Sequence, residues 1–346
     1  MMESPVLLFL GAGASVPLGK PVMKDFVAKL ETEITSENDA ALLSVLISAR
    51  EYDLEAIMTD LETFLSLKYV STFVFDGIEA TLDADKLRSL IRHSIIREYR
   101  TVDLTRALEV YQPLLDTIFS HIDPAVHPLP IFTTNYDLAI EKFCQQQIGY
   151  HLVDGLDVDQ PREGCWNPRE FEKFQFVDMS MWNLSNFSSP DRTRRHIVLF
   201  KLHGSVNWIR EMSTGRIVQS LPMYDLVDSD AYQNTIIYPT SNKGANLEPY
   251  LTGYHYFSKC CEKAKLIIAI GYSFHDYDTL AGLLKGWHVN EDLRLVLLAP
   301  DAYDVLEAIH AEFGSTKPIY GYFGDAQSEP KYLSELDGFL RRYLEK

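Results

Sequence analysis

The sequence predicts an α/β fold in which a doubly wound parallel sheet carries an inserted helical module. Short apolar runs alternate with amphipathic stretches along much of the 346 residues, and several of these runs end in small or polar turn residues. From residue 38 to about residue 100, apolar residues recur every three or four positions, and Gly77 is the only glycine or proline. The first two observations predict the sheet, and the third predicts the insertion.

The N-terminal half begins with a strand over residues 5–10, followed by a small-residue turn and a helix that starts near Pro21. A helix over 104–122, weakened at Pro113, precedes a strand over 129–132. Residues 151–195 are rich in Asp, Pro, Asn, Ser and Arg. They predict an irregular excursion that holds either a hairpin or an oligomer contact.

The C-terminal half contains a strand over 196–201, then short strands near 216–221 and 235–238. Helices are expected at 249–264, 276–287, 301–313 and 331–344, and strands at 265–270, 293–298 and 318–323. Such alternation is typical of a parallel sheet covered by helices. We therefore expect one Rossmann-like domain from residues 1–30 and 101–346, interrupted by a helical module at 31–100.

Composition restricts the location and the partners of the chain. With 32 Lys and Arg against 49 Asp and Glu, the net charge of −17 argues against general nucleic-acid binding and suits a partner with a basic face. No apolar run approaches the ~20 residues of a membrane helix. Residues 6–10 lack the basic flank of a signal peptide, so they are assigned to the first strand. The protein is expected to be cytoplasmic.

The four cysteines favour neither a zinc ribbon nor a disulfide framework. Cys144, Cys165, Cys260 and Cys261 include no pair at the C-x₂₋₄-C spacing. We therefore expect buried thiols that behave as small hydrophobic groups, and no metal.

Four turn segments each follow a predicted strand directly, at residues 11–15, 133–137, 202–205 and 271–274. In an open α/β sheet, ligands bind outside the carboxyl ends of the strands. The glycines of the first and last segments allow a backbone to approach phosphates or a ribose. Together the four segments predict a nucleotide site.

Each segment also has a structural explanation. Gly11 and Gly13 supply half of the G-x-G-x-x-G fingerprint, but position 16 is Val, and a tight turn without a ligand explains them too. Asp137 is placed to cap a helix over 138–143, and Asp276 to cap the helix that follows it. A lone histidine is more often structural, although Gly204 beside His203 permits close approach and imidazole accepts a proton near neutral pH.

In this order, the segments GAGAS, TTNYD, LHGS and GYSFHD resemble the sirtuin (silent-information-regulator-type) family, and within it the bacterial NAD-hydrolysing members of antiphage defence. Residues 150–155 and 238–243 agree with this resemblance. The resemblance implies NAD as the substrate and cleavage of its nicotinamide–ribose bond by water, which gives ADP-ribose and nicotinamide. Deacylating sirtuins carry a four-cysteine zinc module that this chain lacks, and they have Gln and Ile where this chain has Thr134 and Tyr136.

The resemblance also implies roles for individual residues. Asn135 would position water and ribose, Asp137 would organise the pocket, and His203 would act as general base. NAD contacts are implied for Gly11, Ala12, Gly13, Ser15, Thr133, Asn135, Gly271 and Ser273. His127 and His275 are candidates for supporting positions, and Ala299-Pro300-Asp301 stands where many sirtuins place an Asn against the adenosine ribose.

An unregulated NAD hydrolase would poison its own cell, so the resemblance implies an antiviral enzyme that is silent until triggered. Control by a homo-oligomer or by a separate partner is expected, such as a HerA-type ATPase, a short Argonaute or a nucleotide-sensing domain. Two other functions remain open. One is a protein deacylase or ADP-ribosyltransferase, and the other is a non-catalytic NAD-binding regulatory or scaffold subunit.

Overall fold

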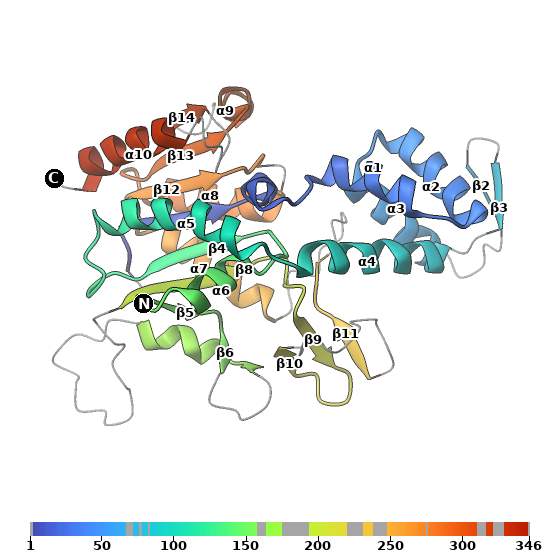
Figure 1. Cartoon of the computed structure of the whole chain (residues 1–346), viewed down its shortest axis with the longest axis horizontal. Coiled ribbons are helices and arrows are strands. Elements are labelled where there is room, and N and C mark those ends of the chain that lie inside the picture. Colours follow the sequence, from blue (N-terminus) through green and yellow to red (C-terminus); the bar gives the residue numbers. More distant parts are fainter. Residues whose placement is uncertain are drawn as a thin grey trace.

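A seven-stranded parallel sheet forms the centre of the molecule (Figure 1). The structure is a computed structural model that describes residues 3–66, 72–75, 78–81, 84–157, 164–174, 194–219, 231–237, 248–274, 276–309, 316–320 and 329–344. The strands of this sheet are β1 (Val6–Leu10), β4 (Leu129–Thr133), β5 (Tyr150–Val153), β8 (Arg195–Lys201), β12 (Leu266–Ile270), β13 (Arg294–Ala299) and β14 (Thr316–Tyr320). Their order is β14-β13-β12-β1-β4-β8-β5, and every neighbouring pair is parallel.

Helices cover both faces of this sheet. Because successive side chains of a strand point to opposite faces, β1 contributes to two separate hydrophobic cores. Val6, Leu8 and Leu10 pack in one core, and Leu7 and Phe9 pack in the other. The first core includes α5 (Leu104–Phe119), α6 (Ala139–Gln146) and α10 (Glu329–Leu344), and the second includes α7 (Tyr250–Cys261), α8 (Tyr277–Val289) and α9 (Ala302–Ile309). The predicted doubly wound α/β fold is thereby confirmed.

A smaller antiparallel sheet lies beside the main one. Its order is β11-β9-β10-β7-β6, and its strands are β6 (Leu156–Asp157), β7 (Cys165–Trp166), β9 (Trp208–Glu211), β10 (Ile217–Gln219) and β11 (Tyr232–Asn234). Two short 3-10 helices are also present: η1 (Ala12–Leu18) follows β1 of the main sheet, and η2 (Pro168–Phe174) follows β7. The excursion expected at 151–195 therefore begins with β5 of the main sheet and contains the β6–β7 hairpin.

The strand expected near 235–238 occurs earlier, as β11 (Tyr232–Asn234); residues 235–237 are not in a strand, and Tyr238 lies outside the described residues. Thr235 N still donates to the Trp208 carbonyl of β9 at 3.3 Å, whereas Ile237 bonds to turns. Ile237 N donates to the His203 carbonyl at 2.8 Å, and the Tyr136 hydroxyl donates to the Ile237 carbonyl at 2.9 Å.

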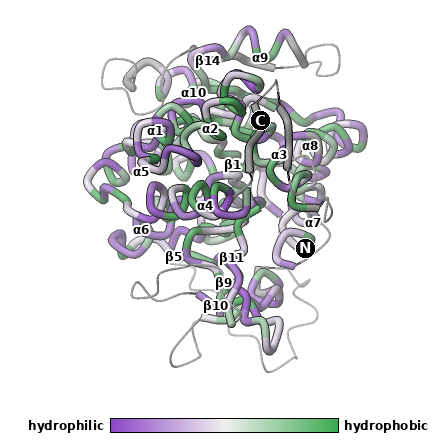
Figure 2. Tube along the Cα trace, turned by 90° about the vertical axis from the view of Figure 1, so that its right-hand side faces the viewer, coloured by the Kyte–Doolittle hydropathy of each residue, from purple (hydrophilic) through white to green (hydrophobic). Residues whose placement is uncertain are grey.

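Residues 23–100, which lie between β1 and β4 in the chain, form an arm that extends to one side of the sheet (Figure 1). Its helices are α1 (Met23–Glu33), α2 (Glu37–Arg50), α3 (Leu54–Ser66) and α4 (Ala84–Arg100). Hydrophobic and hydrophilic residues alternate along α4, as its apolar face requires (Figure 2). The sequence predicts a wholly helical module here, but the arm also contains two strands, β2 (Thr72–Phe75) and β3 (Ile78–Thr81), which pair antiparallel. The aromatic and β-branched run of β2 favours a strand over a helix.

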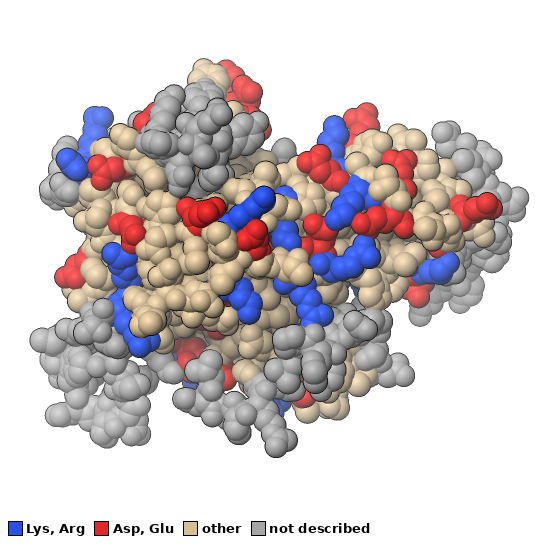
Figure 3. Space-filling model, viewed as in Figure 1, with Lys and Arg blue, Asp and Glu red and all other residues tan. Residues whose placement is uncertain are grey.

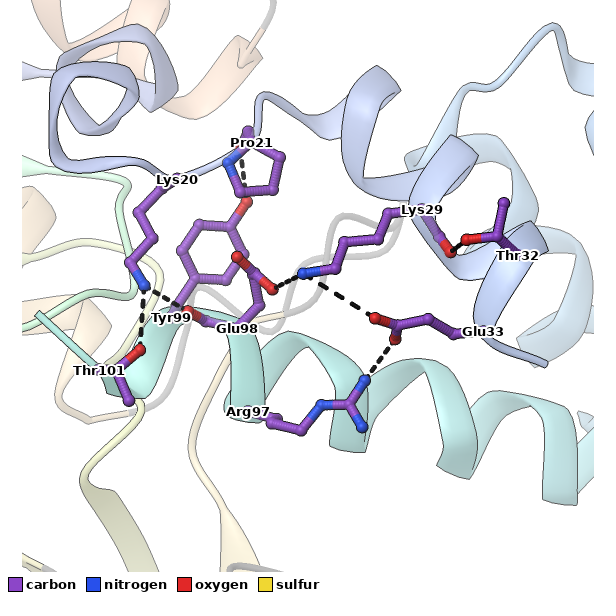
Figure 4. A network of polar contacts seen from close by, with 9 residues as sticks. All are labelled: Lys20, Pro21, Lys29, Thr32, Glu33, Arg97, Glu98, Tyr99 and Thr101. Carbon is purple, nitrogen blue, oxygen red and sulfur yellow. Dashed lines mark hydrogen bonds and ion pairs between the residues drawn. The ribbon is translucent and has the colours of Figure 1, made fainter.

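Polar contacts at the base of this arm join the two segments that connect it to the sheet domain (Figure 4). Lys20 Nζ donates to the Glu98 carbonyl at 2.5 Å and to Thr101 Oγ1 at 3.3 Å. The Tyr99 hydroxyl donates to the Pro21 carbonyl at 2.8 Å. The two segments that enter and leave the arm are thus held together where they cross. Further out, ion pairs join Lys29 to Glu98 and Arg97 to Glu33.

The apolar core of the arm continues to the edge of the main sheet. Tyr99 contacts Tyr136 edge to face, with ring centroids 5.9 Å apart. Tyr136 is 3% exposed and lies in the same hydrophobic cluster as Phe26 of α1 and Val206. The arm therefore packs directly on the turn that follows β4.

Acidic and basic side chains are interspersed over the face of the molecule shown in Figure 3. None of the described helices is long and apolar enough to cross a membrane.

Tyr99→Phe tests the fastening of the arm. The substitution leaves the Pro21 carbonyl without its hydroxyl donor, so we expect the free energy of unfolding to fall by about 1 kcal/mol. Urea unfolding followed by circular dichroism measures the change. The control is Tyr303→Phe on α9, where the side chain is 52% exposed and no change is expected. Equal stability of the two variants would contradict the assigned role.

Candidate functional site

The four turn segments come together at one edge of the sheet. They follow β12, β1, β4 and β8, which are consecutive neighbours in the strand order. Because these strands are parallel, their carboxyl ends share one edge. After β1 the chain adds β4, β5 and β8 on one side of β1, and then β12, β13 and β14 on the other side. The topological switch point, where open α/β sheets bind ligands, therefore lies between β1 and β12 at this edge.

The two glycine turns touch each other through their backbones. Gly11 N donates to the Ile270 carbonyl and Gly13 N to the Gly271 carbonyl, both at 2.9 Å. A Cβ atom on Gly271 would lie 2.4 Å from the carbonyl carbon of Gly13, and Gly271 has a φ of +58°. The glycines are therefore required for this close approach. The N–H groups of Gly11 and Gly13, expected to face a pyrophosphate, are bonded to carbonyl oxygens here.

The turn after β4 is fixed to the turn after β1 by two side chains. Asn135 Nδ2 donates to the Gly11 carbonyl at 2.8 Å, and Ser15 Oγ donates to Asp137 Oδ2 at 2.5 Å. Asp137 Oδ1 also accepts from Ala139 N at 2.9 Å, at the start of α6. The N-cap position of α6 is Leu138 and not Asp137 as predicted, although Asp137 bonds the first residue of the helix while it is bonded to Ser15. The Ser15 hydroxyl, 2% exposed, would have to leave Asp137 to meet a phosphate.

The remaining NAD contacts implied by the resemblance differ in their exposure. Thr133 is buried, and its Oγ1 donates to the Leu10 carbonyl and accepts from Asn135 N, both at 3.0 Å. Ala12 and Gly13 are partly exposed, and Ser273 is exposed at the end of the β12 turn. A ligand can therefore reach the last three from solvent.

His203 pairs with a residue whose functional role the sequence did not reveal. Its Nε2 lies 3.1 Å from Asp276 Oδ2, and both side chains are about nine-tenths buried. Asp276 Oδ2 also accepts from Thr279 Oγ1 at 2.7 Å and from the Tyr254 hydroxyl at 3.4 Å. Asp276 stands at the N-cap of α8 but makes no side-chain capping bond. Its place in GYSFHD is the available sequence signal, and that pattern by itself predicts only the N-cap position.

The His203–Asp276 pair spans the edge of the sheet. These residues follow β8 and β12, which are separated by β4 and β1. Gly204 beside the histidine has a φ of +85°, and a Cβ there would lie 2.4 Å from the Thr235 carbonyl oxygen. The group that approaches Gly204 closely is therefore the backbone of Thr235 in the same chain.

A buried ion pair lies behind the Asn135–Asp137 turn. Lys201 Nζ is 2.9 Å from Glu141 Oε1, and their side chains are 1% and 10% exposed. A cavity of about 10 Å³ there is lined by Leu10, Tyr111, Thr133, Asn135, Asp137, Ile140, Glu141, Leu199 and Lys201. That volume is near the lower limit for one water molecule, so it is too small for a nicotinamide ring. The sequence signal for this pair is a lysine that directly follows the four apolar residues 197–200.

Asp154, which follows β5, is a carboxyl group with a perturbed pKa in this region. Burial, and then the charge of Glu141, raise the pKa of Asp154 from 3.8 to about 6, while the Leu156 N–H and Lys201 oppose the shift. Leu156 N donates to Asp154 Oδ1 at 3.1 Å. Ionisation of Asp154 is therefore less favourable in the folded protein than in the unfolded chain.

Several other sequence predictions also have an outcome. His127 does not support the site, because it precedes β4 and contacts the Glu3 carbonyl at 3.1 Å, at the amino ends of the strands. His275 and the segment 238–243 lie outside the described residues.

Three of the cysteines, Cys144, Cys260 and Cys261, are buried as expected, whereas Cys165 is partly exposed. Burial raises the pKa of Cys260 to about 12, so its thiol is protonated at neutral pH. Within the described ranges, no group of three or more His, Cys, Asp or Glu side chains is arranged to hold a metal.

The chain belongs to the SIR2-like family, because the model of the SIR2-like domain matches residues 130–305. This range contains the turns after β4, β8 and β12, and it excludes the turn after β1.

Solved structures of Sir2 homologues resemble the chain over almost its whole length. An ADP-ribose complex of a Sir2 homologue has a TM-score of 0.45 and 12% identity, covering 99% of this chain and 94% of that one. A Sir2 homologue–NAD complex has a TM-score of 0.46 and 12% identity, covering 98% and 90%. Sir2Tm bound to a propionylated peptide has a TM-score of 0.42 and 11% identity, covering 97% and 94%. No curated protein matches the sequence significantly.

Gly271→Ala tests the contact between the two glycine turns. The added Cβ meets the backbone of Gly13 and φ is positive, so we expect a loss of about 2 kcal/mol or more in the free energy of unfolding. Gly338→Ala on α10 is the control. It is exposed with open space around it, and there alanine should stabilise the helix by about 0.5–1 kcal/mol. Similar stabilities of the two variants in urea would refute the contact.

Asp154→Asn tests the perturbed carboxyl. The raised pKa means that stability from protonated Asp154 is complete below pH 3.8 and is lost as the pH rises through about 6. Asn keeps an acceptor for Leu156 N without the charge. We therefore expect the variant to exceed the wild type by about 1–2 kcal/mol at neutral pH, after allowance for solvent screening, and by less near pH 4.5. Urea unfolding at both pH values measures this, and a constant difference would contradict it.

Proposed function

We propose that this protein is an NAD⁺ hydrolase that cleaves the nicotinamide–ribose bond and releases nicotinamide and ADP-ribose. One observation carries the proposal. Asn135, Asp137 and His203 lie on the turns after the adjacent strands β4 and β8, at the carboxyl edge of the sheet in a SIR2-like chain. Nucleotide binding at that edge is the general behaviour of doubly wound sheets.

NAD would lie across the turns that meet at this edge. The diphosphate would lie over the turn of Gly11, Ala12, Gly13 and Ser15, and the adenosine ribose near Gly271 and Ser273. The partial exposure of Ala12 and Gly13 and the exposure of Ser273 support this placement. The reacting ribose would then face Asn135 and His203.

The chemistry asks little of the protein at the leaving group. Nicotinamide is cationic in NAD and departs neutral with the electron pair of the broken C–N bond, so no acid is needed. The protein must orient the ribose and direct a water molecule to its anomeric carbon. We assign Asn135 to positioning the ribose and the water, and Asp137 to organising the pocket through its bond to Ser15.

His203 would accept the proton that the attacking water loses. A carboxylate accepts a hydrogen bond, so Asp276 favours the tautomer of neutral His203 that carries its proton on Nε2. Nδ1 is then the nitrogen that can accept a proton. Asp276 also stabilises the imidazolium that forms, as the carboxylate of a catalytic triad does.

The positions of the thiols favour water over an acyl-lysine as the nucleophile. Cys144 packs in the core on one face of the sheet, whereas Cys260 and Cys261 pack in the core on the other. These three thiols are therefore not close enough together to form a four-cysteine module like the one that shapes the acyl-lysine cleft of deacylating sirtuins.

Such an enzyme fits a cytoplasmic antiphage effector that depletes NAD during abortive infection. Control would come from a homo-oligomer or from a partner such as a HerA-type ATPase. The strongly acidic chain, with a net charge of −17, would favour a partner with a basic face.

The test is NAD consumption by the purified chain, with nicotinamide and ADP-ribose quantified by chromatography. We expect Asn135→Ala and His203→Ala each to lower the rate by about 100-fold or more, because each removes a group that acts on the reacting atoms. Asp276→Asn should lower it by at least about 10-fold through loss of the favoured tautomer.

The matched control is His288→Ala, which removes an exposed imidazole at the far end of α8 and should leave the rate unchanged. Full activity in the Asn135 or His203 variant would exclude the assigned mechanism. NAD consumption that requires an acyl-lysine peptide would identify a deacylase instead.

A further inference from the structure

The side chain of Lys201 makes four polar contacts, none of which belongs to the hydrogen bonding between strands. It is the last residue of β8, and its Nζ contacts the Tyr136 carbonyl at 3.3 Å, Ser205 Oγ at 3.0 Å and the Asp137 carbonyl. With Glu141 at 2.9 Å, these acceptors surround the three N–H bonds of the ammonium. The contacts come from the turn after β4, from α6 and from the turn after β8.

Stability alone does not explain this buried pair. Removing two charges from water costs about as much as their attraction returns, and apolar residues of similar volume often serve a fold equally well. The four preceding residues of β8, 197–200, illustrate this, since they are apolar and almost fully buried. The ammonium is therefore better explained by what it holds in place.

The groups held by Lys201 belong to the two turns that carry the proposed chemistry. Its carbonyl contacts are in the 135–137 turn, and its hydroxyl contact, Ser205, lies two residues after His203. Without the ammonium, these two turns would lose a shared polar partner. A displacement of about 1 Å between reacting groups can cost about 100-fold in rate.

We propose that Lys201, oriented by Glu141, is a positioning residue that sets the 135–137 turn against the 202–205 turn and thereby places Asn135 relative to His203. The inference rests on the proposed hydrolase function. It does not require Lys201 to touch NAD, and the cavity that Lys201 lines is too small for the nicotinamide ring.

The decisive variant is the double substitution Lys201→Met with Glu141→Leu. Lys201→Met alone leaves the buried carboxylate of Glu141 without its cation and can fail to fold, whereas the double variant fills the site with apolar groups. We expect its melting temperature to stay within about 5 °C of the wild type. We expect kcat for NAD hydrolysis to fall by about 100-fold, with KM changed by less than about threefold.

Lys142→Met is the matched control, because it makes the same exchange at the next position of α6, where the side chain is exposed. It should keep the kcat of the wild type. A folded double variant whose kcat stays within about threefold of the wild type would overturn the proposal and leave Lys201 a structural residue.

Hydrogen exchange without NAD separates this inference from the proposed function. In the double variant, amides of residues 134–142 and 202–208 should exchange at least about 10-fold faster, while those of β13 stay unchanged. This readout needs no enzymatic activity, so it also decides the case in which the wild type hydrolyses no NAD. Unchanged exchange in both turns would refute the positioning role.

Discussion

The contact between the Gly11–Gly13 turn and the Gly271 turn is the constraint on which the rest of the site depends. Two backbones approach so closely there that no side chain fits between them. This contact fixes the Gly11 carbonyl, which accepts from Asn135, and leads into Ser15, which donates to Asp137. The position of the β4 turn thus follows from the packing of two neighbouring turns. The packing of the hydrophobic strands positions the sheet, and the backbone contact between the glycine turns positions the groups at its edge.

Three polar side chains at this edge form bonds that connect different turns. Asn135 joins the β4 turn to the β1 turn, and His203 joins the β8 turn to the start of α8. Lys201 joins the β4 and β8 turns from behind. Each pair is largely removed from solvent, where an unpaired polar group is unfavourable. The edge is therefore built as a connected unit, and a change at one turn reaches the others through few bonds.

The sequence predicted the elements well because their signals are local. Strand-length apolar runs and polar turns identified six of the main-sheet strands and the turns at their carboxyl ends, whereas the short β5 lay within a stretch too polar to show such a run. Pairings such as Lys201–Glu141 and His203–Asp276 join residues 60 and 73 positions apart, and no local pattern reports them. The glycines show a subtler limit. Their composition indicated close approach correctly, but only the fold shows that the approaching group is another stretch of the same chain.

The edge-to-face contact between Tyr99 and Tyr136 limits which homologues can lack the arm. Tyr136 is buried between Asn135 and Asp137, and part of its cover is supplied by the arm. A shortened homologue that lost the arm would expose this ring to water beside Asn135. Such a homologue would need a smaller residue at that position or a new cover for it. Deletion of the arm and substitution of Tyr136 are therefore expected to occur together in natural sequences.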